Sequence, residues 1–285
     1  MKPSLIAWLL AGWLALAGAA PAATTALVTL PATERRPALV MHWAPLDAQR
    51  RPAVVALHGC GGLYQRDGHT LEARYPGYIE RLHALGYHVL LPDSFGSRGL
   101  GAVCAQPYGS RSTGIPERRA DVLDALAWLR AQPGVDGDRI ALLGWSNGAT
   151  TAISTMDARQ SPPAPPLAAV VLFYPGCGHQ QAARPAAGAV LMQLGGADDW
   201  TPPQSCEQLA RRWQAAGHDV QLDVYAGAYH GFDSDKPVRF RADVPNGRSA
   251  SGVHQGGNPE AASASQVRLA DFLRRRLGGT GQSRP

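Results

Sequence analysis

Residues 144–148 read G-W-S-N-G, a serine between two glycines at the spacing G-x-S-x-G. The apolar run Ile140–Leu143 precedes this pentapeptide and a helix-like stretch follows it, which is the strand–turn–helix context that the motif requires. A sharp turn there lifts the serine hydroxyl above the sheet edge. Glycines are needed beside the serine because larger side chains would collide with the helix that follows. A glycine-rich turn without chemistry is the alternative, but the context predicts that Ser146 is a nucleophile.

A serine hydroxyl needs a general base, and the base needs an acid that orients it. After such a turn the acid comes first along the chain and the histidine second. The loop 195–202, G-G-A-D-D-W-T-P, follows an apolar run and offers Asp198 and Asp199. Its G-x-x-D spacing favours Asp198, with Asp199 as the alternative. The loop 227–232, G-A-Y-H-G-F, follows the next run and supplies His230.

Three other histidines fall in loops on the same side of the predicted sheet. His58 precedes the serine, His179 follows a different strand, and His254 has no strand directly before it. Each of them therefore departs from either the chain order or the strand context that the motif requires. His230 is therefore the predicted base.

A developing oxyanion needs backbone N–H donors. Asn147 offers one at the start of the helix, and Cys60 offers a second in the glycine-rich turn His58–Gly62. Cys60 has a thiol, but it lacks the strand–turn–helix context of a nucleophile. No HExxH or CxxC motif and no G-x-G-x-x-G at the first strand–helix turn occurs, so we predict neither a metal nor a cofactor.

The elements around these residues alternate between short apolar runs and helical patterns, which indicates a mostly parallel α/β sheet of about eight strands with helices on both faces. The predicted strands are Ala26–Leu30, Ala38–Trp43, Ala53–Leu57, His88–Leu91, Ile140–Leu143, Ala168–Phe173, Val190–Leu194 and Gln221–Tyr225. The predicted helices are Leu71–Leu85, Pro116–Ala131, Asn147–Met156, Pro203–Ala216 and Pro259–Leu277.

Four long loops follow predicted strands: Gly59–Thr70, Asp93–Ile115, Gly176–Gly188 and Gly227–Gly257. Ligand sites of parallel α/β sheets lie at the carboxyl ends of the strands. We therefore expect these loops to border one cleft, with the last loop long enough to form a lid.

Residues 1–23 have one lysine, an apolar stretch and small residues at two candidate cleavage sites. This layout is typical of a secretory signal peptide, with a retained membrane anchor as the alternative. We expect a secreted or periplasmic protein without stable membrane insertion, whose residues 24–285 form one domain.

The cysteines, Cys60, Cys104, Cys177 and Cys206, suggest two disulfides in an oxidising compartment. Four cysteines allow three pairings.

The formal net charge is +5 across 285 residues. The basic residues are scattered and lack interleaved aromatics on a single face, so a nucleic-acid partner is not predicted. Composition leaves the oligomeric state undefined.

The motifs HGCGGL, LLPDSFGSRG, RIALLGWSNGA, FYPGC, GGADDWTPPQSC and YHGF occur in this order. Together they resemble the exported branch of the dienelactone hydrolase family within the α/β-hydrolase superfamily, over roughly Arg51 to Leu277. The resemblance implies the triad Ser146, Asp198 and His230, and disulfides Cys60–Cys104 and Cys177–Cys206. It also implies that dienelactone is a doubtful substrate. Members that cleave it use cysteine as nucleophile and an arginine four residues after the histidine, where this chain has Ser234.

The sequence thus predicts an exported serine hydrolase that cleaves a small carboxylic ester or lactone through an acyl-enzyme. A peptidase or polyester depolymerase on the same fold is the enzyme alternative. The alternative outside catalysis is a binding module with an inactive serine turn.

Overall fold

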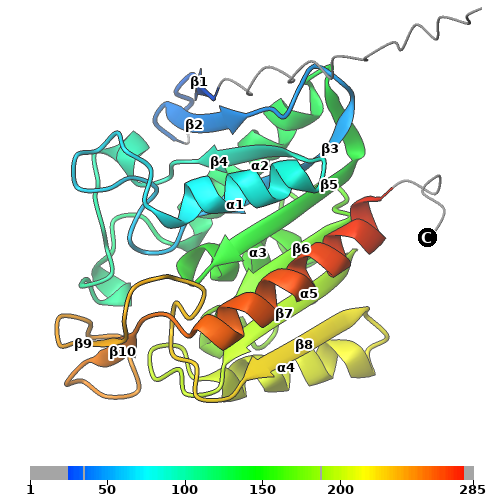
Figure 1. Cartoon of the computed structure of the whole chain (residues 1–285). Helices are drawn as coiled ribbons and strands as arrows, with labels where there is room; N and C mark the ends of the chain where they lie inside the picture. The colour runs from blue at the N-terminus through cyan, green and yellow to red at the C-terminus, as the bar shows by residue number, and fades with distance from the viewer. Residues whose placement is uncertain (1–24, 35, 187, 279–285) are drawn as a thin grey trace, which may run out of the picture.

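Eight strands form one sheet in the order β1-β2-β4-β3-β5-β6-β7-β8 (Figure 1). The computed structural model describes residues 25–34, 36–186 and 188–278, so the expected signal peptide, 1–23, lies outside the described residues. The neighbouring strands from β4 to β8 run parallel, and the β1–β2 and β2–β4 pairs are antiparallel. The strands are β1 Ala26–Leu30, β2 Leu39–Ala44, β3 Arg51–Leu57, β4 His88–Pro92, β5 Val135–Trp145, β6 Ala169–Phe173, β7 Ala189–Gly195 and β8 Val220–Tyr225.

Helices cover both faces of this sheet, which confirms the predicted fold class. They are α1 Arg74–Ala84, α2 Ile115–Arg130, α3 Asn147–Met156, α4 Pro203–Ala215 and α5 Pro259–Leu277, with short 3₁₀ turns η1 Gly96–Arg98, η2 Tyr108–Ser110 and η3 Gly178–Gln180. Element boundaries agree with the predictions closely, with two larger differences. Strand β5 begins at Val135, five residues before the predicted start at Ile140. The polar segment 136–139 has no apolar pattern, so the sequence did not indicate that the strand begins before it. Helix α1 begins at Arg74 and not at Leu71.

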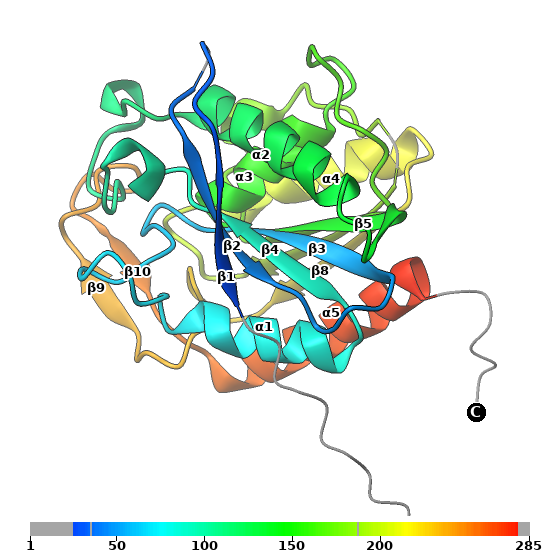
Figure 2. The same cartoon turned by 90° about the horizontal axis from the view of Figure 1, so that it is seen from above.

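The two faces of the sheet have separate apolar cores. Successive strand residues point to opposite faces, so in β3 Val54 packs on the side of α1 and α5 while Val55 packs on the side of α2, α3 and α4. Figure 2 shows these two helical layers on either side of the strands. Strands covered on both faces have continuous apolar runs, which is why the central strands were visible in the sequence.

Strand order reverses at β3, which lies between β4 and β5. Loops that follow the two strands of such a switch point leave in opposite directions and open a crevice between them. The glycine-rich turn after β3 therefore lies beside Ser146 after β5. The same sheet edge receives the ends of β6, β7 and β8, which carry Tyr174, the 195–202 loop and the 227–257 segment.

The long segment 227–257 contains two short strands that the sequence did not predict. Strands β9 Arg239–Arg241 and β10 Val253–Gln255 pair antiparallel, and at three residues each they are too short for a readable alternation. The segment is packed inward through Val244 and Val253, which are 1% and 0% exposed and share an apolar cluster with Trp200. Asn246 joins it to the loop before α2 through its Nδ2, which donates to the Gln106 carbonyl at 2.8 Å.

Across the part of the chain that the structure describes, no helix combines the length and apolar character needed to cross a bilayer.

Two disulfides tie the loops at the carboxyl edge. Cys60 is bonded to Cys104, which joins the turn after β3 to the loop before α2. Cys177 is bonded to Cys206, which joins the loop after β6 to α4. These are the pairs that the family resemblance implied.

Non-reducing peptide mapping of protein purified without reductant should recover these two pairs. The Cys177→Ala/Cys206→Ala variant should unfold with a free energy lower by about 2–4 kcal/mol in urea titrations, because the crosslink restricts the unfolded chain. Free thiols or a different pairing in the map would contradict the assignment.

Candidate active site

Ser146 occupies the turn between β5 and α3 in a strained backbone conformation. Its φ is +53° and its ψ is −116°, a region that residues with a side chain rarely adopt. The two glycines of the motif make the turn possible. A Cβ on Gly148 would lie 2.0 Å from the Leu57 carbonyl oxygen, and one on Gly144 would lie 2.6 Å from the Ala149 nitrogen. Neither position accepts a larger residue without moving backbone.

The structure brings Ser146, His230 and Asp198 into one hydrogen-bonded chain. Ser146 Oγ lies 2.9 Å from His230 Nε2, and His230 Nδ1 lies 2.8 Å from Asp198 Oδ2. His230 is 2% exposed and Asp198 is 4% exposed. With Nδ1–H donating to the carboxylate, Nε2 is the acceptor for the serine proton. This arrangement matches the nucleophile–base–acid geometry that acyl transfer needs.

Asp198 is held by its own loop. Its Oδ1 accepts the backbone N–H groups of Trp200 and Thr201 at 2.9 and 2.8 Å. The Thr201 hydroxyl donates to Oδ2 at 3.0 Å. The carboxylate is therefore oriented toward His230 before any substrate arrives.

The neighbouring Asp199 points elsewhere. Its carboxylate accepts the His254 backbone N–H at 2.8 Å and lies 2.7 Å from His254 Nδ1. It thus links the acid loop to β10. The geometry agrees with the sequence preference for Asp198, because of these two adjacent carboxylates only Asp198 contacts His230.

The other candidate histidines are placed differently from His230. His58 is fully buried and contacts the backbone of its own turn. His179 lies in η3, and His254 is the partner of Asp199. Among the described residues, the histidine that accepts from Ser146 Oγ is His230.

Two aromatic rings enclose His230. The rings of Tyr174 and Trp200 each lie 4.6 Å from the imidazole, centroid to centroid. Trp200 belongs to the acid loop, and Tyr174 follows β6 with a φ of +38°. The rings restrict the imidazole to the plane that reaches both Ser146 and Asp198.

Sequence reasoning missed a buried carboxylate, Asp233, three residues after the histidine. Asp233 has no exposed side-chain area. It accepts from Arg74 Nη1 at 2.9 Å, Tyr78 Oη at 2.8 Å, Trp145 Nε1 at 3.0 Å and Tyr174 Oη at 2.6 Å. Four donors from α1, β5 and the end of β6 thereby hold the histidine loop.

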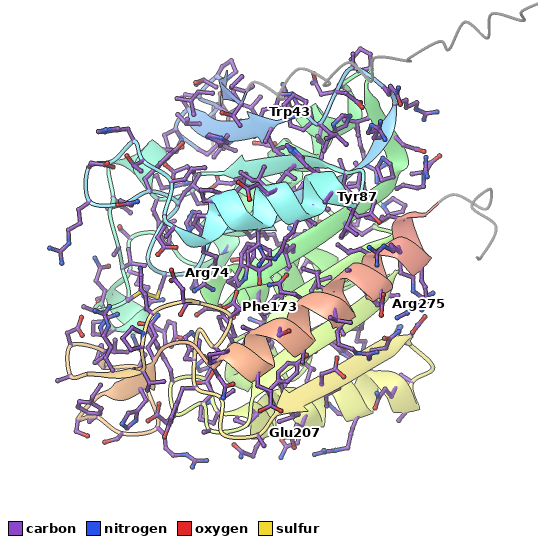
Figure 3. The ribbon with its side chains drawn as sticks, viewed as in Figure 1. Trp43, Arg74, Tyr87, Phe173, Glu207 and Arg275 are labelled. Carbon is purple, nitrogen blue, oxygen red and sulfur yellow. A yellow bond between two sulfur atoms is a disulfide. The ribbon has the colours of Figure 1, made fainter. Side chains whose placement is uncertain are left out.

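Arg74 supplies the charge that balances Asp233. It stands at the start of α1, on the side of the molecule where Phe173 ends β6 (Figure 3). Burial by itself lowers the pKa of Arg74, but the carboxylate of Asp233 and the neighbouring tyrosines together outweigh it and hold that pKa well above its ordinary value. The only sequence signal for this pair was the position of Asp233 directly behind the Y-H-G-F motif.

A cavity of about 350 Å³ opens over Ser146 and His230. Of the two residues predicted as oxyanion donors, Cys60 lines the cavity wall. Asn147 follows Ser146 as the first residue of α3, where backbone N–H groups have no partner within the helix. A Cβ on Gly59 would lie 3.7 Å from Ser146 Cβ, so the turn after β3 packs directly against the serine.

The outer wall of the cavity has charged side chains. Lys236 is paired with Glu72 at 2.8 Å, while Arg239 and Arg241 come from β9. Within the described residues there is no group of three or more histidine, cysteine or carboxylate side chains that could hold a metal ion.

Solved structures share this fold at low sequence identity. Esterase 2 of Thermogutta terrifontis, phosphoramylated by tabun, is 20% identical with a TM-score of 0.61, covering 95% of this chain and 100% of that chain. A dienelactone hydrolase-like promiscuous phosphotriesterase from metagenomic libraries is 21% identical with a TM-score of 0.62, covering 90% and 100%.

Curated relatives match a shorter part of the chain. The proteins named "Probable dipeptidyl-aminopeptidase B" of Talaromyces stipitatus and Talaromyces marneffei are 30% and 31% identical over 130 residues, which is 46% of this chain. The matched region spans 13% of each relative's length. A family model described as the dienelactone hydrolase family matches residues 39–277. This chain therefore belongs to the dienelactone hydrolase family.

Proposed function

We propose that the protein is a serine hydrolase that cleaves carboxylic esters or lactones through an acyl-enzyme. The observation that carries this proposal is the continuous chain from Ser146 Oγ through His230 to Asp198 at the base of the cavity. Family membership and the esterase fold of the solved structures are consistent with it.

In the first half-reaction, Ser146 Oγ attacks the carbonyl carbon while His230 Nε2 takes the hydroxyl proton. Asp198 keeps the imidazole in the tautomer that can accept this proton and stabilises the imidazolium. The backbone N–H groups of Cys60 and Asn147 donate to the oxyanion. The tetrahedral intermediate collapses, His230 returns the proton to the leaving alkoxide, and an acyl-serine remains.

In the second half-reaction, water attacks the acyl-serine. His230 takes a proton from the water and then delivers it to Ser146 Oγ as the C–O bond breaks. A carboxylic acid leaves and the enzyme returns to its starting state. A lactone follows the same steps, with the alcohol remaining attached to the acid.

The cavity size favours a small substrate. About 350 Å³ lies at the lower end of ligand pockets in proteins. In dienelactone-cleaving members of the family the arginine that Ser234 replaces here binds the substrate carboxylate, and four arginines of this chain are candidates to replace it. Arg98 is paired with the buried Asp121 at 2.7 Å, and Arg111 stacks on Tyr108. Arg239 and Arg241 line the cavity. We do not propose dienelactone as the substrate.

Replacing the nucleophile tests the proposal directly. Ser146→Ala should lower turnover of p-nitrophenyl acetate at least about 10⁴-fold, because no group remains to form the acyl-enzyme. It should also abolish labelling by a fluorophosphonate probe. Ser154→Ala, in the same helix and 7% exposed, serves as the control and should keep both. Undiminished turnover in Ser146→Ala would remove the basis of the proposal.

The two adjacent aspartates provide a matched pair. Asp198→Asn should lower kcat by about 10³–10⁴-fold, because an amide donor at this position stabilises the wrong histidine tautomer. Asp199→Asn should stay within about tenfold of the wild type, since its partner is His254. Stopped-flow or steady-state ester hydrolysis measures both, and a larger loss in Asp199→Asn than in Asp198→Asn would reverse the assignment.

The match of 130 residues to the probable dipeptidyl-aminopeptidases favours a second candidate function, a peptidase activity of the same triad. Aminoacyl p-nitroanilides assayed beside p-nitrophenyl esters separate the two activities. A higher kcat/KM for the anilides would select the peptidase.

We further propose that residues 1–23 direct export. The two disulfides support this, since they persist in oxidising compartments. Expressed in a bacterium with a periplasm, the protein should be recovered from the periplasm or medium. N-terminal sequencing should then begin after Ala19 or Ala22, the two small-residue cleavage sites. An intact Met1 in the membrane fraction would contradict this.

A further inference from the structure

Arg118 is a buried cation beneath the active site that the proposed reaction does not use. It belongs to α2 and is 1% exposed. In the described part of the chain its hydrogen-bond acceptors are neutral oxygens, and its Nε has no partner. The carboxylates of Asp121 and Asp93 favour its charge electrostatically, but neither is hydrogen-bonded to it among the described residues. Burying a charge costs several kcal/mol, so the position of this guanidinium needs an explanation beyond packing.

The two acceptors of Arg118 belong to the two segments that supply the proposed oxyanion donors. Nη2 donates to the His58 carbonyl at 2.7 Å. Nη1 donates to Oδ1 of Asn147, the residue after the nucleophile. One rigid planar group therefore joins the turn after β3 to the first residue of α3.

His58 extends this support to the Cys60 N–H. Its Nε2 accepts the Ser94 backbone N–H at 3.3 Å, so the neutral ring has its proton on Nδ1, which donates to the Gly59 carbonyl at 2.9 Å. Burial, followed by the charge of Arg118, lowers the pKa of His58 well below its ordinary value and keeps the ring neutral. The Gly59 carbonyl and the Cys60 N–H belong to one planar peptide group. Holding the carbonyl sets the direction of the N–H.

Phe95 completes the packing around these groups. The Arg118 guanidinium lies 4.9 Å from the centre of the Phe95 ring, and the ring stands edge-on to His58 at 4.8 Å. Burial lowers the pKa of Arg118 to about 10, so the side chain stays protonated at neutral pH. A fixed positive charge in a dry environment behind the donors also favours negative charge in front of them.

We propose that Arg118 is a positioning residue of the reaction, which sets the Cys60 and Asn147 N–H groups relative to one another by bridging the His58 carbonyl and the Asn147 side chain. This inference rests on the proposed serine hydrolase activity.

Substitutions at Arg118 test the proposal, with its neighbour as control. Arg118→Met keeps the length of the side chain and removes both hydrogen bonds and the charge, and Arg118→Lys keeps the charge without the fork. Arg119→Met is the control. Arg119 is the next residue of α2, is 6% exposed and also donates to backbone carbonyls. Its acceptors, the carbonyls of Ser154 and Pro162, do not belong to the segments that supply the proposed oxyanion donors.

The expected result is a loss in kcat that is separate from substrate binding. Removing one oxyanion donor costs about 10²–10³-fold in kcat, and we expect about 10²-fold for Arg118→Met and about tenfold for Arg118→Lys, with KM within about threefold of wild type. The rate of inactivation by a fluorophosphonate should fall in the same order. Arg119→Met should lower the melting temperature but leave kcat within about twofold. A kcat for Arg118→Met within about threefold of wild type, or equal losses in both variants, would overturn the proposal.

A double-mutant cycle keeps the test decisive if Arg118→Met does not fold. Asn147→Ala removes one partner of Arg118 while the arginine stays in place. Arg118→Lys should then have a smaller effect on kcat in the Asn147→Ala background than in the wild type. Equal effects in both backgrounds would overturn the proposal.

Labelling of Ser146 in the wild type is measured in the same series. Its absence would mean that the proposed function itself fails, whereas a labelled wild type with insensitive Arg118 variants would refute this inference alone.

Discussion

The close approach of α3 to the end of β3 is the constraint on which the active site depends. Gly148 lies so near the Leu57 and His58 carbonyls that any Cβ would overlap them. This contact forces the sharp turn in which Ser146 takes its positive φ and presents its hydroxyl above the sheet. It also places the N-terminus of α3 against the glycine-rich turn, so Ser146 and the proposed oxyanion donors are set by the same contact.

Buried charges hold the site from two sides. On one side, Asp233 and Arg74 connect the histidine loop to α1, β5 and the end of β6. On the other, Arg118 connects the turn after β3 to Asn147. The Arg74–Asp233 ion pair contributes little net stability, because desolvation opposes its attraction, and Arg118 has only neutral hydrogen-bond acceptors among the described residues. What these groups contribute is geometry, since each forms several hydrogen bonds and so holds more than one loop in a fixed arrangement.

Fold class and the chain of Ser146, His230 and Asp198 could be anticipated because their signals are local. Glycine spacing and apolar runs express the turn and the covered strands within a few residues, and chain order places the acid and base on successive strand ends. Strands β9 and β10 were not anticipated, because three-residue strands have no readable period. The Arg74–Asp233 pair was missed because its members are 159 positions apart and neither belongs to a motif.

The sequence by itself determined the sheet, the serine turn and the loops that carry acid and base, because each depends on residue types that are close together in the chain. The sequence favoured Asp198 over Asp199 by its spacing, but the tertiary structure supplied the contacts that separate these two chemically identical carboxylates: His230 lies opposite one and His254 opposite the other. The tertiary structure also decided the contacts of Arg118, whose partners His58 and Asn147 are distant in the chain. Contacts between distant segments exist only after the sheet has folded, and for that reason no local pattern records them.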